Sequence, residues 1–324
     1  MADLSSAPDA HVSVLAAEVV QALAPPLAAT SDSILVDATT GLGGHTLRLL
    51  EAATPGLTVL LDRDTDALAL AKERLNSAPC PLHFVHAPFS AIASELAAVD
   101  IETVTAIVAD LGVSSIQLDR VERGFSFRGD AALDMRMDPS RGETAADVLA
   151  DIQVPELTSI LAKYGNEPDA RRIAGAIVKM RPTTTAALAD IVTNAMTGRQ
   201  RRKLGLRIHP ATRTFQALRI HVNDELGELQ RLLADAPSLL AVGGRLGIIT
   251  FHSLEDRRVK HRFRELSAPP QLPPHLPILE SERPRPKFSL PSEFARGVTP
   301  STAELDANPR SRSARLRVLQ RDLP

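Results

Sequence analysis

The feature that most constrains the fold of this chain is a regular alternation, over about its first 120 residues, of short apolar runs with helical segments. Runs rich in Val, Ile and Leu predict strands at residues 34–37, 57–62, 82–85 and 104–110. Helical spacing occupies the segments between them, at residues 45–52, 65–76 and 91–99. Because the strands are apolar throughout, both faces of the sheet should be covered. The pattern therefore predicts an α/β fold with a parallel sheet.

The alternation stops between residues 119 and 209, where the sequence predicts helices at 145–150, 154–164, 169–180 and 185–196. It resumes after Pro210, with helices predicted at 212–222, 224–236 and 254–266, a glycine turn at 242–245, and strands at 246–251 and 314–319. The last strand should close one edge of the sheet, and the proline-rich residues 268–300 should be irregular. These boundaries predict a discontinuous sheet domain, residues 1–118 and 210–324, and an inserted all-helical domain, residues 119–209.

The composition is that of an ordinary globular protein, with 324 residues, 44% of them hydrophobic and 23% charged. The chain is long enough to bury a sizeable core, and disorder or a coiled coil is excluded for the whole of it. A lone cysteine, Cys80, excludes an internal disulfide and a cysteine-ligated metal site. No apolar run is long enough to span a bilayer and the first residues are polar, so we expect a soluble, cytoplasmic protein.

The formal charge of −2 conceals a local basic block. Seven Lys and Arg residues and no acid lie between Arg199 and Arg219. Such a block is either a solvated surface or a site for a polyanion. Tryptophan is absent and Tyr164 is the sole tyrosine, so an aromatic platform for stacking single-stranded bases is not expected. The histidines lack metal-ligand spacing, and no metal is expected.

The segment between the first predicted strand and its helix is rich in glycine, running from Asp37 through Gly41, Gly43 and Gly44 to His45. Glycines there permit a tight turn and close approach of the backbone to a ligand. Asp62 ends the next strand, where an acid can bind the hydroxyls of a ribose. The dinucleotide fingerprint needs glycine where this chain has Thr46, so the segment favours S-adenosylmethionine over NAD, and a structural turn remains the third alternative.

Two further strands end in residues of interest. Phe89 follows the third strand, where an adenine contact or a core phenylalanine is expected. Asp110 ends the fourth, at the position where amine methyltransferases hold the reacting amino group. Their usual signature, Asp or Asn followed by two prolines and an aromatic residue, is absent here.

Several longer segments resemble the ribosomal RNA small-subunit methyltransferase H family. They include Asp110-Leu-Gly-Val-Ser-Ser, Arg123-Gly-Phe-Ser-Phe, Leu133-Asp-Met-Arg-Met-Asp, His209-Pro-Ala-Thr-Arg-Thr-Phe-Gln-Ala and Phe251-His-Ser-Leu-Glu-Asp-Arg. The similarity runs in order from about His11 to Arg321. It implies a class I S-adenosylmethionine-dependent methyltransferase, Rossmann-like, with an inserted helical substrate-recognition domain.

The resemblance also implies a reaction, which is direct in-line methyl transfer to the exocyclic N4 of one cytidine in the decoding region of bacterial 16S rRNA. The cofactor contacts that it implies fall on Gly43, Gly44, His45, Asp62, Phe89, Asp110 and Gln117, beside the loop residues Asp37 and Gly41. The expected partner is 16S rRNA or the small ribosomal subunit, with no membrane and no DNA, and the chain should be a monomer or a homodimer.

Asp110 is the candidate for accepting the amino hydrogens of cytosine, which favours the pyramidal nitrogen of the transition state. Polar residues expected around the target base or RNA are Asp134, Arg136, Tyr164, His209, Arg213, His252, Ser253 and Glu255. Each of these could instead form a structural ion pair or helix cap. Two other functions stay open, a ribosome-assembly factor that uses the cofactor only for affinity and a methyltransferase of DNA or of small amines.

Overall fold

The structure is a computed structural model that describes residues 13–127, 129–205, 209–270 and 285–324, and only the backbone of Ser115. The chain divides into two compact units. The sheet unit comprises the described residues up to Gly112 together with Glu228–Pro324, and the helical unit comprises Val113–Gly227. Within the described ranges, no helix is both long and apolar enough to cross a membrane.

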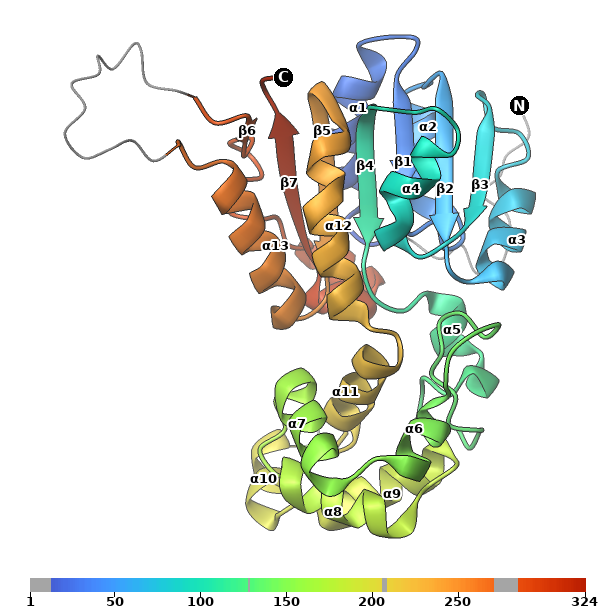
Figure 1. The fold of residues 1–324 in the computed structure, drawn as a ribbon, viewed down its shortest axis with the longest axis vertical. Helices are drawn as coiled ribbons and strands as arrows, with labels where there is room; N and C mark the ends of the chain where they lie inside the picture. Colours follow the sequence, from blue (N-terminus) through green and yellow to red (C-terminus); the bar gives the residue numbers. More distant parts are fainter. Residues whose placement is uncertain (1–12, 128, 206–208, 271–284) are drawn as a thin grey trace, which may run out of the picture. The chain divides into compact units, whose positions relative to one another are not determined.

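The sheet unit is built on a seven-stranded sheet with the order β3-β2-β1-β4-β5-β7-β6 (Figure 1). Its strands are β1 (Ile34–Asp37), β2 (Leu57–Asp62), β3 (Leu82–His86), β4 (Val104–Asp110), β5 (Leu240–Thr250), β6 (Phe288–Ser289) and β7 (Arg315–Arg321). β1 to β5 run parallel, and β7 runs antiparallel to both β5 and β6.

Helices cover both faces of this sheet. They are α1 (Ala16–Ala28), α2 (Gly44–Ala52), α3 (Thr65–Arg74), α4 (Ile92–Ala97), α12 (Glu225–Leu239) and α13 (Ser253–Leu266). A short helix, α14 (Thr302–Ala307), has no buried residue. Side chains of successive strand residues point to opposite faces of the pleated sheet, so they pack in different cores. Val36 packs with residues of α4, α12 and α13, whereas Leu35 packs with residues of α1 and α2. Figure 1 looks onto the face that α4 and α12 cover. Two buried faces explain why the strands are apolar throughout.

The direction of the strand order reverses between β1 and β4, where Asp37 pairs with Val108. Ligands of open α/β sheets bind at the carboxyl ends of the strands beside such a reversal. Asp37, Asp62 and Asp110 end β1, β2 and β4, so all three acids lie at this edge. The arrangement is the Rossmann-like sheet typical of S-adenosylmethionine-dependent methyltransferases, with a helical insertion between β4 and β5. The predicted fold class is confirmed.

Two expectations for the sheet unit need correction, and one helix was missed. Residues 242–245 were expected to form a turn, but they lie within β5, where the pairing with β4 shifts register and Gly243 has a φ of +84°. A bulge of this kind lets glycines stand inside a long strand. β7 was expected at the edge, yet the two-residue β6 lies outside it. Helix α1 was not predicted, and it contains Pro25 and Pro26. Of the proline-rich segment, residues 271–284 lie outside the described residues.

The helical unit has its own apolar core, which includes Leu133, Leu161, Ile173, Leu188 and Leu218. Its helices are α5 (Ser115–Asp119), α6 (Ala145–Asp151), α7 (Val154–Gly165), α8 (Ala170–Met180), α9 (Thr185–Ala195), α10 (Gly198–Leu204) and α11 (Thr212–Val222). The four helices expected at 145–196 are confirmed within about one residue. The unit is larger than the expected insertion of residues 119–209, because α5 and α11 also belong to it.

Candidate active site

Asp37 is held by the loop that follows it. Its Oδ2 accepts a hydrogen bond from Thr46 Oγ1 at 2.7 Å, and its Oδ1 accepts one from the Thr39 backbone N–H at 3.2 Å. Burial raises the pKa of Asp37 above its ordinary value, although the Thr46 hydroxyl and the nearby His45 oppose this effect. Both carboxylate oxygens therefore hold the loop in place, and a contact of Asp37 with the cofactor stays a prediction.

Asp62 fastens the same loop to the next strand. Its Oδ2 accepts a hydrogen bond of 2.7 Å from the backbone N–H of Gly41, whose φ of +51° is left-handed. Its Oδ1 accepts one of 2.8 Å from Asp64 N–H. Burial raises the pKa of Asp62 to about 6, and the two N–H donors act in the opposite direction. A carboxylate has about four lone-pair sites, so Asp62 retains the capacity to accept from two hydroxyls.

The next two glycines of the loop, Gly43 and Gly44, are required by the packing of the protein itself. Gly43 has a φ of +72°, and a Cβ there would lie 2.9 Å from Leu75 Cδ1. At Gly44 a Cβ would collide with Ser13 Oγ. At Gly41, by contrast, a Cβ would have only Thr39 O nearby, at 3.9 Å. The loop is therefore packed tightly against protein at Gly43 and Gly44 and has space beside Gly41.

Buried His45 and half-buried Asp110 form a pair where α2 meets the end of β4. His45 Nε2 lies 3.3 Å from Asp110 Oδ2. Burial disfavours the charged imidazole, but the hydrogen bond and charge of Asp110 outweigh it, and the pKa of His45 is raised above its ordinary value. The other two polar atoms, His45 Nδ1 and Asp110 Oδ1, are buried with no hydrogen-bond partner among the described residues. Buried polar atoms of this kind call for a ligand, a water or an ion.

Phe89 begins a short 3₁₀ turn (Phe89–Ala91) after β3 and packs partly against the core. The guanidinium of Arg63 lies 5.6 Å from the centre of its ring, a cation–π distance. Arg63 Nη2 also lies 3.7 Å from Glu228 Oε2. The core position of Phe89 was one of its two expected roles, and contact with an adenine stays a prediction.

The three candidates that follow β5 build the start of α13. His252 is the N-cap residue of this helix, and its Nδ1 accepts from Glu255 N–H at 3.4 Å. Glu255 Oε2 in turn accepts from the backbone N–H groups of Phe251 and His252, at 2.8 and 3.2 Å. This reciprocal capping box satisfies backbone donors that the helix leaves free. Ser253 is exposed in the first turn. A role for these residues around the target base stays a prediction.

In the helical unit, Asp134 and Arg136 satisfy each other. Arg136 Nε and Nη2 donate to the two oxygens of Asp134 at 2.7 and 2.9 Å. Burial acts to raise the pKa of Asp134, but Arg136 outweighs it, and the pKa is lowered.

Gln117 belongs to a capping box with Ser114, because its Oε1 accepts from Ser114 N–H at 3.0 Å. The expected cofactor contact of Gln117 stays a prediction.

The remaining candidates of the helical unit lie near its basic block. The ring of His209 stacks on Phe127 at 4.3 Å, and Arg213 Nη1 donates to Asn166 O at 3.3 Å. Tyr164 is half-buried, with Lys163 Nζ 5.0 Å from the centre of its ring. Arg219 is not part of a free basic surface, because its Nε donates to Glu225 at 2.7 Å.

Most of the described basic block lies on α10. Arg199, Arg201, Arg202 and Lys203 of this helix are exposed, and Arg207 lies outside the described residues.

Residues 9–322 of the chain match the model of the MraW methylase family. The chain belongs to this family. It is 47% identical over 324 residues to the ribosomal RNA small subunit methyltransferase H of Aromatoleum aromaticum, and the match covers 98% of each chain. Proteins of the same name from Citrifermentans bemidjiense and Frankia casuarinae are 45% and 47% identical, with at least 96% of each chain covered. This MraW methylase is therefore an enzyme, and S-adenosylmethionine is its methyl donor.

The residues of the sheet unit fit that donor. S-adenosylmethionine carries a ribose, a carboxylate, an ammonium and a positively charged sulfonium. Asp62 has lone pairs left for ribose hydroxyls, and the acids at this edge favour a cation. His45 Nδ1 and Asp110 Oδ1 are the buried polar atoms that such a ligand could satisfy. When bound, the donor supplies an electrophilic methyl group.

Sequence reasoning missed several residues of this site. In the sequence, Thr46 served only as evidence against a dinucleotide-binding loop. In the structure, its hydroxyl donates a hydrogen bond to Asp37. Thr39 accepts a hydrogen bond of 2.6 Å from Asp110 N–H and thereby joins the glycine loop to β4. No sequence pattern indicated that Arg63 lies beside Phe89. Thr46 could have been found, because a hydroxyl close in sequence to a buried strand-end acid is a common partner of that acid.

Proposed function

We propose that this methylase transfers a methyl group from S-adenosylmethionine to the exocyclic N4 of a cytidine in the decoding region of 16S rRNA. The curated relatives support the rRNA class, because they are named for the ribosomal small subunit. One observation carries the choice of an amino nitrogen. Asp110 Oδ1 is a buried acceptor, without a partner among the described residues, at the edge where the cofactor residues gather.

The chemistry explains why a free acceptor matters. The lone pair of a cytosine amino group is delocalised into the ring, so the nitrogen must become pyramidal before it attacks. An acceptor for one amino hydrogen stabilises that geometry, and a fixed acceptor needs no reorganisation. His45 holds Asp110 Oδ2 at 3.3 Å, which leaves Oδ1 for the amino group. The methylated nitrogen is strongly acidic and loses its proton without a strong base, so a carboxylate is sufficient.

Positioning supplies the rest of the proposed catalysis. Asp62 accepts from hydroxyls of the nucleoside, and Asp37 and Thr46 keep the loop in one conformation. When two reacting centres are held in line at about 3–3.5 Å, the bimolecular step becomes effectively unimolecular. This lowers the activation barrier by several kcal/mol. Gly43, Gly44, Phe89 and Gln117 are the other proposed cofactor residues.

The helical unit is the proposed reader of the RNA. We assign this role to residues 113–227 rather than to the smaller range 119–209, since α11 carries Arg213. The exposed cations of α10 suit phosphate contacts, which give salt-dependent affinity without sequence information. The proposed partner is 16S rRNA or the small ribosomal subunit, and the proposed location is the cytoplasm.

The test is methyl transfer with mapped products. Purified protein is incubated with labelled S-adenosylmethionine and, separately, naked 16S rRNA, small subunits, DNA and small amines. The labelled RNA is digested to nucleosides, which are separated against N4-methylcytidine, 5-methylcytidine and 2′-O-methylcytidine standards. Label in N4-methylcytidine supports the proposal, and label in another nucleoside refutes its N4 part. Tight rRNA binding with no transfer to any substrate would instead favour an assembly factor.

A further inference from the structure

Helix α13 presents a basic surface that the proposed function has not used. Arg257, Lys260, His261 and Arg264 are all exposed. They recur at intervals of three and four residues, so they lie on one side of the helix, away from the buried Val259 and Phe263. We call Arg257, Lys260 and Arg264 the α13 stripe. They span eight residues, or about 10 Å along the helix axis.

The three cations of the α13 stripe are not engaged in the fold. No hydrogen bond or ion pair joins their side chains to another residue in the part of the chain that the structure describes. The other cations of the helix are used. Arg258 donates to Leu254 O at 2.9 Å, and Arg262 donates to Leu233 O at 3.2 Å and pairs with Glu265 at 3.1 Å.

Among the described residues, the acid that lines this surface is already paired with a neighbour. That acid is Glu265, and Asp256, earlier in the helix, is likewise paired, with Arg317 at 2.7 Å. Among the described residues, no acid pairs with the three positive charges of the stripe, and these charges repel one another. An external anion would relieve that repulsion.

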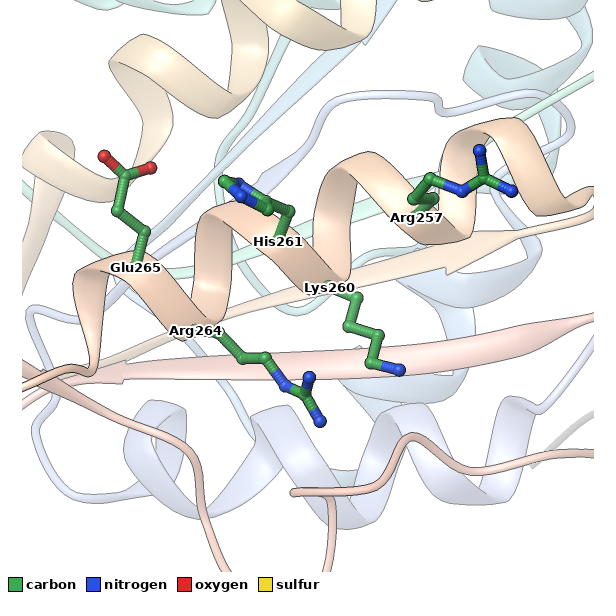
Figure 2. Close-up of a pocket in the computed structure, with 5 residues that line it drawn as sticks. All are labelled: Arg257, Lys260, His261, Arg264 and Glu265. Atoms are coloured by element: carbon green, nitrogen blue, oxygen red, sulfur yellow. The ribbon is translucent and has the colours of Figure 1, made fainter.

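The surface is also hollowed. A depression of about 560 Å³ is lined by the three cations of the stripe together with His261 and Glu265. Figure 2 shows these side chains along α13, with Lys260 and Arg264 pointing to the same side of the helix. On that side, Leu290 and Phe294 adjoin Lys260 and Arg264. The hollow has room for an extended chain beside these cations.

We propose that the α13 stripe binds the phosphate backbone of the substrate rRNA, as a second RNA-contacting surface on the sheet unit. The proposal rests on the proposed function. Charge complementarity favours RNA. The adjoining ring of Phe294 is buried, so the stripe offers positive charge rather than an exposed ring for stacking, which suits phosphates rather than bases. Contacts of this kind add salt-dependent affinity and fix the register of the RNA, and they do not select a sequence.

The test compares two triple variants of the full chain. The stripe variant is Arg257→Gln, Lys260→Gln and Arg264→Gln. The control variant, Arg48→Gln, Lys72→Gln and Arg231→Gln, removes the same charge from exposed residues of α2, α3 and α12. Both are measured for binding of S-adenosylmethionine, for binding of naked 16S rRNA at several salt concentrations, and for KM and kcat with that RNA. Unchanged cofactor binding shows that a variant is folded.

The stripe variant is expected to bind naked rRNA roughly tenfold more weakly at low salt, and its slope of log K against log salt should be smaller by about 2. Its KM for RNA should rise while kcat at saturation is kept. Binding and slope equal to those of the control variant would overturn the proposal. A defect confined to intact subunits, with naked rRNA bound normally, would also overturn it and assign the stripe to an acidic protein surface. If wild-type protein binds rRNA through the stripe but transfers no methyl, the proposed function fails and this proposal stands.

Discussion

The hydroxyl of Thr46 donates a 2.7 Å hydrogen bond to Oδ2 of Asp37, and both residues are buried. Thr46 stands in α2 and Asp37 ends β1, so this bond closes the glycine loop between them. The position that separates this chain from the dinucleotide fingerprint is thus the position that anchors its loop. A glycine there could not supply the hydroxyl.

Thr46→Val is expected to weaken both the fold and cofactor binding. Valine fills the same space but leaves Asp37 Oδ2 without its side-chain donor, which costs about 1–3 kcal/mol in a buried site. Denaturant unfolding should report that loss, and calorimetric titration should report weaker binding of S-adenosylmethionine. Thr46→Ser keeps the hydroxyl and is the control. Equal stability of the valine and serine variants would contradict the anchoring role.

Asp62→Ala is expected to weaken S-adenosylmethionine binding by about 1.5–3 kcal/mol, or roughly 10- to 150-fold in Kd, as for a lost charge-assisted hydrogen bond. The Gly41 N–H also loses its acceptor, so part of the effect should come from the loop. The control is Glu73→Gln on the exposed side of α3. Equal Kd values for Asp62→Ala and wild type would remove the proposed ribose contact.

Asp62 should also make cofactor binding depend on pH. Burial raises its pKa to about 6, so the carboxylate that accepts from hydroxyls forms fully only above that value. Affinity for S-adenosylmethionine is expected to increase as the pH rises from about 5 to about 7. In Asp62→Asn this rise should disappear while any contribution of other groups persists. Titrations across the range test the expectation, and identical profiles for the two proteins would exclude Asp62 as the source.

The stability of the ligand-free protein should respond to Asp62 in the opposite direction. The folded chain keeps the proton up to about pH 6, whereas the unfolded chain releases it near the ordinary pKa of 3.8. Between these values the folded state binds more protons, so the contribution of this group to the free energy of unfolding falls as the pH rises. The difference in the free energy of unfolding between wild type and Asp62→Asn, measured at matched pH values, isolates this contribution. The prediction would be contradicted if the free energy of unfolding of wild type increased relative to that of the variant as the pH rises.

Asp110→Asn separates the two roles that one carboxylate could have. If Oδ1 accepts an amino hydrogen in the transition state, kcat with rRNA should fall by about 100-fold or more while RNA affinity stays near that of wild type. Single-turnover methylation measures the step directly. Glu102→Gln, an exposed acid before β4, is the control. Normal kcat at saturating cofactor, with a raised Kd for S-adenosylmethionine alone, would restrict Asp110 to cofactor binding.

The strands that carry the site were predictable because their signal is local. β4 was predicted at its observed bounds, and the acids that end β1, β2 and β4 followed from where each apolar run stops. Parallel pairing then brings strand ends to one edge, whatever the connections between them. The edge of the candidate site could therefore be derived without tertiary information.

The features that were missed depend on partners distant in sequence. Gly243 and Gly244 resemble a turn, and it is pairing with β4, at Leu240 and again from Arg245, that continues β5 across them. The two prolines of α1 argue against a helix, yet buried Leu23 and Leu27 hold it against the sheet. The sequence left open whether His252 and Glu255 lie around the target base or form a helix cap, and only the structure shows that they cap α13. Such roles are decided by geometry rather than by residue type.

Two glycines of the helical unit offer a final, matched prediction. A Cβ at Gly165, the last residue of α7, would lie 2.6 Å from the carbonyl oxygen of Arg213 in α11. A Cβ at Gly175, in the middle of α8, would meet nothing within 4 Å. Gly165→Ala should therefore force the two helices apart and destabilise the protein by about 1–3 kcal/mol. Gly175→Ala should stabilise it by about 0.5–1 kcal/mol, because alanine restricts the unfolded chain and favours a helix.

Denaturant unfolding of both variants measures these changes. Because α11 carries Arg213, Gly165→Ala should also weaken rRNA binding, whereas Gly175→Ala should leave it unchanged. The close packing of α7 against α11 would be contradicted by a Gly165→Ala protein as stable as wild type. If that protein were destabilised but bound rRNA normally, the packing would stand and the contribution of α11 to RNA binding would be refuted.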